Sequence, residues 1–212
     1  MDPATRLARS LRPHVADRRV LDAVASVPRE LFVPPQVREH AYDDCALPIG
    51  RGQTISQPLI VARMLELLEL RPDDRVLDVG TGSGWHAALL SRLAAHVWTI
   101  ERHRDLSAWA AANLAAAGIG GDAVTVLAGD GSLGLPEQAP FDAVNVAAAA
   151  WPDVPAPLVE QLAPGGRLVA PVGGEGQRLV LLERSADGDE LRRTGLEPVR
   201  FVPLVAGEPG GG

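Results

Sequence analysis

The sequence predicts an α/β fold, with a doubly wound and mostly parallel sheet that carries helices on its faces. From residue 75 onward, short apolar runs alternate with stretches of helical periodicity. Short connections between such elements favour parallel strands joined by crossover helices. The first apolar run ends in the glycine-rich turn Gly80–Gly84, which leads directly into a helical stretch. The length of 212 residues fits a single domain, 1–212, built around this sheet.

The composition narrows the classes of function. The formal net charge of −7 argues against nucleic acid as a partner, because phosphate contacts need a basic face. No apolar run approaches the length of a membrane span, and residues 1–20 lack the apolar centre of a signal peptide. The single cysteine, Cys45, cannot form an internal disulfide, which favours a reducing compartment. We expect a cytoplasmic protein without membrane contact, in which Cys45 is partly buried and structural rather than a nucleophile.

Residues 1–57 are expected to form N-terminal helices and a loop that covers substrate and cofactor. Apolar residues recur at helical spacing and are interrupted by Pro13 and Pro28, so two short helices are predicted within residues 1–30. Residues 31–57 show no periodicity but remain rich in apolar side chains. A long irregular segment inside a compact domain is usually functional.

Residues 58–172 form the predicted nucleoside-binding core, residues 173–206 carry C-terminal strands, and the glycine-rich tail 207–212 is expected to fray. Pro58 is placed to open a helix that Pro72–Asp74 ends. Apolar runs predict strands at 75–79, 96–100, 123–127, 141–146, 166–172, 178–184 and 192–201, with turns at Gly165-Gly166 and Asp187-Gly188. Helices are predicted at 84–93, 104–117 and 155–162.

Chemistry-bearing residues follow the ends of successive predicted strands. Ligands of such sheets bind at the carboxyl ends of the strands, so the glycine turn, Glu101 and Gly129–Gly131 are expected to meet at one edge. A carboxylate at Glu101 can hold a ribose by its two hydroxyls. The spacing G-x-G-x-G, rather than G-x-G-x-x-G, favours S-adenosyl-L-methionine over a dinucleotide. Asp130 is placed to accept from an adenine amino group, or simply forms a turn. Asp78 either contributes through water and the turn, or is satisfied by backbone amides.

A second candidate site precedes the first helix of the core. The segment Gly52–Ser56 offers the hydroxyls of Thr54 and Ser56 in front of free helical N–H groups, which attract an anion. These hydroxyls either hold a substrate carboxylate or cap the helix, and the spacing does not decide between the two. Histidines and cysteines do not cluster at metal-binding spacing, so no metal site is expected. His86 and His103 are expected at the solvated surface.

The element Gly52-Gln-Thr-Ile-Ser-Gln-Pro58 is the most specific motif of the chain. It occurs together with Val27–Pro34, Ala41–Asp44, Leu47–Gly50, Val76–Trp85, Gly129–Gly131, Ala139–Ala143, Leu162–Val169 and Val199–Val205. Together these segments resemble the protein-L-isoaspartate O-methyltransferase family over nearly the whole chain. General methyltransferases share the glycine turn but not the Gly52–Pro58 element.

The resemblance implies a Rossmann-like, S-adenosylmethionine-dependent methyltransferase fold with an unusual strand order near the carboxyl end. It implies methyl transfer from S-adenosyl-L-methionine, with S-adenosyl-L-homocysteine as product, to the α-carboxylate of L-isoaspartyl residues in damaged proteins and peptides. The ester then forms a succinimide, whose hydrolysis returns some aspartate. By this resemblance Ser56 is the catalytic residue. Cofactor contacts are implied at Thr54, Ile55, Ser56, Asp78, Gly80, Gly82, Gly84, Glu101, Arg102, Asp130 and Gly131, and substrate contacts at Thr54, Ser56, Ala147, Val202 and Leu204.

The chain departs from the family pattern at three positions. Trp85 replaces a tyrosine that is frequent after the glycine turn, Leu59 stands where an aromatic residue or histidine is common, and Ala147 lacks the hydroxyl of a threonine. These changes leave the cofactor prediction intact and leave fine substrate preference open.

Three other interpretations stay open at the level of sequence. A related methyltransferase that modifies one dedicated peptide in natural-product maturation would share every cofactor motif. A nicotinamide-dependent oxidoreductase would share the glycine turn and Glu101, but not the Gly52–Pro58 element. A non-catalytic binding module would have lost the glycines or Glu101, and none is lost. Nothing in the sequence demands an obligate partner, so a monomer is expected.

Overall fold

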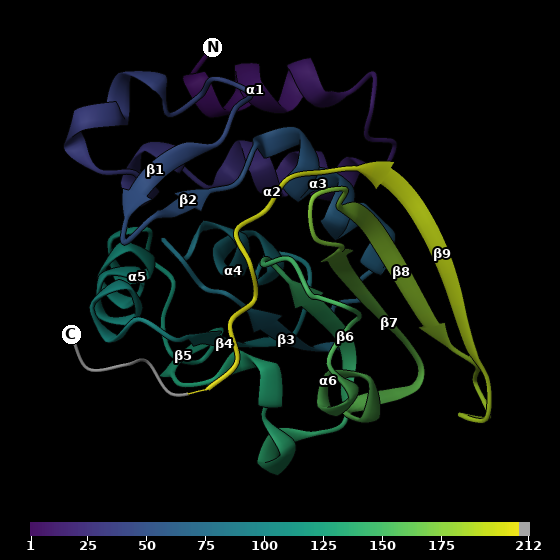
Figure 1. The fold of residues 1–212 in the computed structure, drawn as a ribbon. Coiled ribbons are helices and arrows are strands. Elements are labelled where there is room, and N and C mark those ends of the chain that lie inside the picture. Colours follow the sequence, from purple (N-terminus) through teal and green to yellow (C-terminus); the bar gives the residue numbers. More distant parts are fainter. Residues whose placement is uncertain (208–212) are drawn as a thin grey trace.

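The computed structural model describes residues 1–207 and confirms the predicted fold class. A seven-stranded sheet runs through the molecule in the order β5-β4-β3-β6-β7-β8-β9 (Figure 1). The first five strands in this order are parallel, and β8 and β9 continue the sheet as an antiparallel meander in chain order. The strands are β3 (Arg75–Val79), β4 (His96–Glu101), β5 (Val124–Ala128), β6 (Phe141–Val146), β7 (Leu162–Val172), β8 (Arg178–Arg184) and β9 (Leu191–Pro198).

Two apolar cores lie on the two faces of the sheet. Successive residues of a strand point to opposite faces, so Val76 packs into the larger core and Leu77 into the smaller one. The smaller core includes Leu158 of α6 (Ala156–Glu160) and Leu135, which lies between the 3-10 turns η3 (Gly131–Leu133) and η4 (Pro136–Gln138). The larger core contains residues of α1 (Pro3–Leu11), α2 (Arg18–Ser26), α3 (Pro58–Leu68), α4 (Trp85–Leu90) and α5 (Arg104–Ala116).

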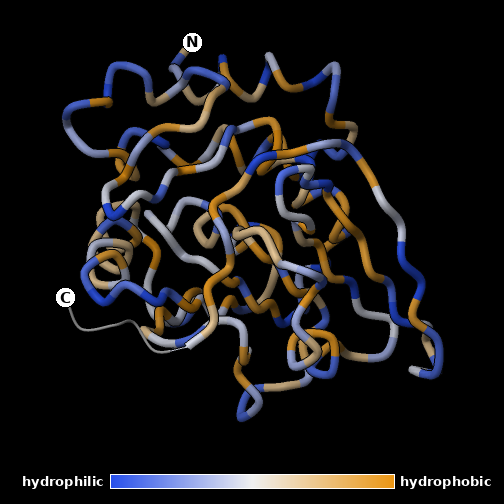
Figure 2. The backbone as a smooth tube through the Cα atoms, in the orientation of Figure 1, coloured by the Kyte–Doolittle hydropathy of each residue, from blue (hydrophilic) through white to orange (hydrophobic). Residues whose placement is uncertain are grey.

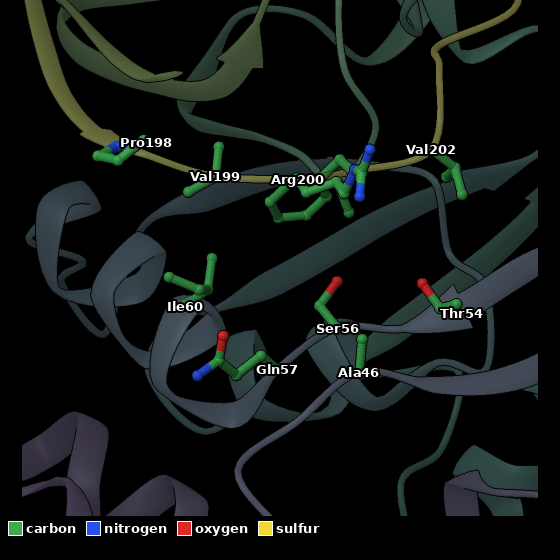
Figure 3. Close-up of a pocket in the computed structure, with 11 residues that line it drawn as sticks. Ala46, Thr54, Ser56, Gln57, Ile60, Pro198, Val199, Arg200 and Val202 are labelled. Atoms are coloured by element: carbon green, nitrogen blue, oxygen red, sulfur yellow. The ribbon is translucent and has the colours of Figure 1, made fainter. Parts of the chain in front are cut away.

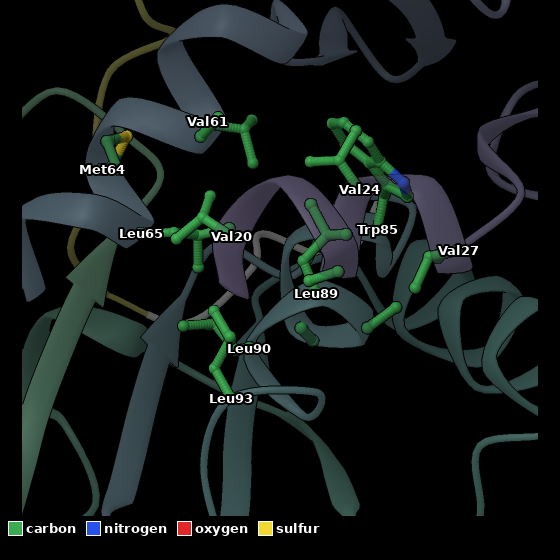
Figure 4. Packing of buried hydrophobic residues seen from close by; sticks show 14 of the residues in the cluster. Val20, Val24, Val27, Val61, Met64, Leu65, Trp85, Leu89, Leu90 and Leu93 are labelled. Atoms are coloured by element: carbon green, nitrogen blue, oxygen red, sulfur yellow. The ribbon is translucent and has the colours of Figure 1, made fainter. Parts of the chain in front are cut away.

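The two predicted N-terminal helices are present and belong to the larger core. Val24 of α2, Leu65 of α3 and Trp85 of α4 are buried in one apolar cluster (Figure 4). Hydrophobic residues are concentrated along the central strands, whereas the outer strand β9 is largely polar (Figure 2). Among residues 1–207, no helix combines the length and the apolar character that a membrane crossing requires.

Residues 31–57 are more regular than predicted. Gly50, Arg51 and Gly52 have positive φ values of 93°, 53° and 70°, and this left-handed backbone forms the tight turn of a hairpin. The hairpin strands are too short to show an apolar period, which explains why the pattern looked irregular. The elements of this region are η1 (Arg29–Phe32), η2 (Pro35–His40), β1 (Leu47–Gly50) and β2 (Gln53–Ile55).

Several element ends differ from the predictions. The strand predicted at 166–172 begins at Leu162, because Gly165-Gly166 forms an irregularity inside β7 rather than a turn before it. A Cβ atom on Gly166 would lie 2.9 Å from two backbone carbonyl oxygens, so this close approach requires glycine. The helix from Pro58 ends at Leu68, before the segment Pro72–Asp74 that was expected to stop it, through a left-handed residue at Glu69.

The chain leaves the sheet at Pro198, earlier than the predicted strand 192–201. Residues 199–205, here called the strap, then cross the carboxyl ends of the parallel strands (Figure 1). Ala149 N donates to Val202 O (2.7 Å), and Leu204 N donates to Ala149 O (2.8 Å). The strap is therefore paired with the segment that follows β6. Fraying was predicted for the tail 207–212, of which residues 208–212 lie outside the described part of the chain.

Candidate active site

Three cavities with shared walls lie at the carboxyl ends of the parallel strands. The outer cleft, about 700 Å³, is bounded by the β1–β2 hairpin, the start of α3 and the strap (Figure 3). The second cavity, about 100 Å³, adjoins the glycine turn and Glu101 and is here called the nucleoside pocket after its predicted ligand. The inner pocket, about 30 Å³, adjoins the glycine turn and the start of α4. Thr54 and Ala147 line all three cavities, so β2 and the end of β6 meet where the cavities join.

Glu101 is held in a fixed orientation at the end of β4. The residue is 5% exposed, and its two carboxylate oxygens accept hydrogen bonds from Gly82 N (2.9 Å) and His103 N (3.0 Å). Each carboxylate oxygen has two acceptor positions. Both oxygens therefore keep the capacity to accept from a ligand in the nucleoside pocket, which Glu101 lines.

A polar network lies beneath the glycine turn. Asp78 is fully buried, and its carboxylate accepts from Thr99 Oγ1 and Asn145 Nδ2, both at 2.7 Å. Thr99 Oγ1 also lies 2.6 Å from Thr81 Oγ1 in the turn. Burial raises the pKa of Asp78 to about 6, and the charge of Glu101 adds to this rise. Asp78 thus ties the turn to β4 and β6 through side chains, rather than through the backbone amides considered as an alternative.

His86 extends this network into the inner pocket, so the prediction of a solvated side chain is wrong. It is 6% exposed, and Asn145 Nδ2 lies 3.3 Å from its Nδ1. The amide has one hydrogen for Asp78 and one for Nδ1, which assigns the proton of the neutral imidazole to Nε2. Burial lowers the pKa of His86 to about 3. His86 Nε2 and Trp85 Nε1 lack hydrogen-bond partners among the described residues, and both side chains line the inner pocket.

The start of α3 is capped by Asp44 from a distant loop, so Thr54 and Ser56 do not serve as the helix cap. Asp44 accepts hydrogen bonds from Leu59 N (2.8 Å) and Gln57 Nε2 (3.0 Å). The hydroxyls of Thr54 and Ser56 instead point across the outer cleft toward the strap (Figure 3). Because Asp44 supplies the cap, these hydroxyls remain available to a ligand.

Arg29 fixes the backbone of Ser56 from inside the protein. It is fully buried, and its guanidinium donates to Ala41 O (2.6 Å), Cys45 O (3.1 Å) and Ser56 O (2.9 Å). It also lies 5.0 Å from the ring centre of Trp85, a cation–π contact. Burial lowers the pKa of Arg29 to about 10, so it stays charged at neutral pH. One buried cation therefore joins the covering loop, the candidate catalytic residue and the wall of the inner pocket.

The side-chain amide of Gln177 anchors the strap. Its Oε1 accepts from Phe201 N (2.6 Å), and its Nε2 donates to Phe201 O (3.0 Å). The backbone oxygen of Gln177 also accepts from Val199 N (3.1 Å). These bonds hold the strap in place, so that Val202 lines both the outer cleft and the nucleoside pocket.

Comparison with known proteins identifies the family. The family model described as protein-L-isoaspartate(D-aspartate) O-methyltransferase (PCMT) matches residues 4–209. This chain belongs to that family. A protein-L-isoaspartate O-methyltransferase of Roseiflexus castenholzii (strain DSM 13941 / HLO8) is 57% identical over 197 residues, which make up 93% of this chain and 88% of the relative. A protein of the same name from Methanoregula boonei (strain DSM 21154 / JCM 14090 / 6A8) is 55% identical over 192 residues, 90% of this chain and 86% of the relative. The family predicted from the sequence is confirmed.

Two solved structures with this family name share the fold. One has a TM-score of 0.83 and 27% identity, and the match covers 95% of this chain and 65% of that chain. The other is a protein-L-isoaspartate O-methyltransferase (beta-aspartate methyltransferase) from Plasmodium falciparum in complex with S-adenosyl-L-homocysteine. Its TM-score is 0.82 at 25% identity, with 97% of this chain and 99% of that chain covered.

Most residues that the family resemblance implies as ligand contacts line the three cavities. Ser56 lines the outer cleft and the inner pocket, and Ile55 the inner pocket alone. Leu204, implied as a substrate contact, lines the nucleoside pocket and not the outer cleft. The residues Gly80, Gly82, Glu101, Arg102 and Gly131 line the nucleoside pocket.

Three implied cofactor contacts lie outside these cavity walls. Asp78 lies in the network beneath the turn, and a Cβ on Gly84 would lie 3.3 Å from the backbone oxygen of Ala110 in α5. Asp130 accepts from Ser132 N (2.9 Å) and Ser132 Oγ (2.7 Å), which corresponds to its alternative as a turn residue. It lines a neighbouring recess together with Arg102.

The structure also brings in residues that sequence reasoning missed. Arg200 and Phe201 line the outer cleft, and the half-buried His103 lines the nucleoside pocket. The apolar residues on both sides of His86 in α4 were the available sequence signal for its burial. Cys45 is exposed, contrary to the prediction of partial burial. Its carbonyl, rather than its side chain, is fixed by Arg29.

Proposed function

We propose that this chain transfers the methyl group of S-adenosyl-L-methionine to the α-carboxylate of L-isoaspartyl residues in damaged proteins and peptides, with Ser56 as the catalytic residue. The reaction class is that of the family to which the chain belongs. The shared cavity wall supports the residue assignment, because Ser56 lines both the outer cleft and the inner pocket. A methyl group that passes from a cofactor in the nucleoside and inner pockets to a peptide in the outer cleft has to cross this junction.

The residues around the nucleoside pocket and the inner pocket fit S-adenosyl-L-methionine. Glu101 offers two oriented acceptor oxygens for the ribose hydroxyls. Trp85 Nε1 and His86 Nε2 offer N–H donors at the inner pocket, which suits the carboxylate of the amino-acid end. A Cβ on Gly131 would lie 2.6 Å from Val79 Cγ1, so only glycine fits at this wall. When bound, the cofactor supplies an electrophilic methyl group on a sulfonium.

The protein has to orient the substrate carboxylate rather than deprotonate it. An α-carboxyl group has an ordinary pKa of about 3.5 and is ionised at neutral pH. The hydroxyl of Ser56 can donate one hydrogen bond to it and leave lone pairs free for attack. The walls of the inner pocket include no acidic or cationic side chain among the described residues, since His86 is neutral. A cation at this point would lower the nucleophilicity of the carboxylate.

Three successive segments of the chain have different proposed roles. Residues 1–57 cover the site, residues 58–172 bind the nucleoside, and residues 173–206 carry the strap, and we propose that they act as one domain. Recognition through the strap backbone suits the many sequences in which damage occurs. We further propose a monomer in a reducing compartment such as the cytoplasm, where the free, exposed thiol of Cys45 stays reduced.

The decisive experiment uses two synthetic peptides that differ only in isoaspartate or aspartate at one position. Transfer of a labelled methyl group is expected on the isoaspartyl peptide alone. Methylation of neither peptide, with binding of S-adenosyl-L-homocysteine retained, would overturn the repair function and favour a dedicated peptide substrate.

The same assay tests Ser56. Ser56→Ala is expected to slow methylation about tenfold or more, since it removes one hydrogen bond to a charged group, while calorimetric affinity for S-adenosyl-L-homocysteine stays nearly unchanged. Ser10→Ala on α1, outside the three cavities, is the matched control. A large loss of cofactor affinity would instead assign Ser56 to cofactor binding or to loop structure.

A further inference from the structure

Arg200 is the only charged side chain among the described residues that line the outer cleft. It is exposed and belongs to the strap. Figure 3 shows it across the cleft from Ser56 and Thr54, whose hydroxyls point toward the strap. The other walls are aliphatic, aromatic, hydroxyl or amide groups. The cleft therefore presents one positive charge on an otherwise neutral surface.

The charge of Arg200 is not neutralised within the described part of the chain. Arg200 forms no ion pair with any residue in 1–207, and the acidic groups near the cleft have other partners. Glu197, which precedes the strap, pairs with Arg63 at 3.3 Å. Asp44 accepts from the start of α3 at 2.8 Å. The guanidinium is thus free to pair with a carboxylate that enters the cleft.

The position of Arg200 separates it from the carboxylate that is methylated. Arg200 lines the outer cleft, but neither the nucleoside pocket nor the inner pocket. The cavities join at Thr54 and Ala147, where the methyl group has to pass. A guanidinium at that junction would stabilise the negative charge of the attacking oxygen and lower its nucleophilicity. Arg200 is placed instead to meet a neighbouring residue of the substrate.

We propose that Arg200 makes this enzyme selective for isoaspartyl residues that have an acidic residue beside them, an inference that rests on the proposed function. A guanidinium can form two parallel hydrogen bonds with a carboxylate. A concave surface with a single sign of charge also concentrates the field on an incoming ligand. Arg200 acts as a specificity-determining residue for the flanking side chain, while Ser56 orients the methyl acceptor.

The test compares isoaspartyl peptides that carry Glu, Gln or Lys on either side of the isoaspartate. At low salt, kcat/KM is expected to be about threefold higher for Glu than for Gln on at least one side, and lowest for Lys, as for a partly exposed ion pair. Added salt should reduce these differences in kcat/KM. Arg200→Gln should abolish it, and Arg200→Glu should reverse it. Arg12→Gln, an exposed change of the same charge on the N-terminal side, should leave it intact.

The outcomes separate the two proposals. Methylation of all isoaspartyl peptides at equal kcat/KM, or a full preference for Glu retained by Arg200→Gln, would overturn the role of Arg200 and leave the repair function standing. Methylation of none by the wild-type protein would overturn the repair function itself. Unchanged affinity of the Arg200 variants for S-adenosyl-L-homocysteine would show that they are folded.

Discussion

The proposed nucleoside side and the proposed substrate side of this site are built in different ways. On the nucleoside side, Asp78 and Glu101 are buried at the ends of adjacent parallel strands, and each carboxylate oxygen has a hydrogen-bond partner. On the substrate side, a short hairpin faces an exposed strap, and one amide side chain, Gln177, supplies much of the anchoring. Burial fixes the first side, whereas on the second side the strap is held by a few partly exposed bonds.

The difference fits the two tasks. A cofactor has one shape, so a preformed pocket loses little entropy on binding it. Damaged peptides vary in sequence, so the surface that binds them has to accept different side chains. Changes on the nucleoside side should therefore have larger effects than changes on the strap.

The largest effect is expected from Glu101→Gln. The substitution keeps the shape but removes the charge and one acceptor oxygen, and hydrogen bonds to charged groups contribute about 1.5–3 kcal/mol. Affinity for S-adenosyl-L-homocysteine, measured by calorimetry, should fall roughly tenfold to a hundredfold. Glu160→Gln on α6 is the control. Unchanged affinity would show that the ribose is bound elsewhere and would contradict the proposed contrast between the nucleoside side and the substrate side.

His86 and Asp78 should shift the pH dependence of stability in opposite directions. The pKa of His86 is lowered to about 3 in the folded protein. Between about pH 3 and pH 6.5, His86 therefore binds a proton in the unfolded chain but not in the folded one. The free energy of unfolding therefore falls as the pH falls through this window. The pKa of Asp78 is raised to about 6. Between about pH 4 and 6 the folded chain holds the extra proton, so the free energy of unfolding falls as the pH rises.

Replacing His86 by Gln removes the first of these contributions. The difference in free energy of unfolding between the wild-type protein and His86→Gln should shrink by about 2 kcal/mol from about pH 6 to about pH 4.5. Urea unfolding at each pH measures it, with His14→Gln as the matched change at an exposed position. A difference that stays constant with pH would mean that His86 titrates normally in the folded protein.

The smallest effect is expected from Gln177→Ala. It removes the two side-chain bonds to Phe201, so the strap should lose order near the outer cleft while the inner pocket, which the strap does not line, keeps its shape. The KM for an isoaspartyl peptide should rise about threefold, as expected for one or two weak hydrogen bonds. Affinity for S-adenosyl-L-homocysteine should not change. Gln36→Ala serves as control. If the affinity for S-adenosyl-L-homocysteine fell by the same factor as the KM for the peptide rose, the two sides would not be independent.

Patterns within short stretches predicted the central sheet well. The strand predicted at 75–79 and that at 141–146 have the observed bounds, because parallel strands buried on both faces read as continuous apolar runs. The hairpin of residues 47–55 was missed, since its strands are too short to show a period. The burial of His86 was missed because burial depends on what covers α4, not on the residue itself.

The sequence by itself determined the family, the parallel sheet and the glycine turn that adjoins the nucleoside pocket. These depend on contacts between residues that are close along the chain or on adjacent strand ends. Only the tertiary structure decided that Asp44 caps α3, that Arg29 fixes Ser56, and that the strap covers the outer cleft. Asp44 and α3 lie in separate segments, and the strap lies far along the chain from the hairpin that it faces. No local periodicity records such pairings, because folding alone brings these segments together.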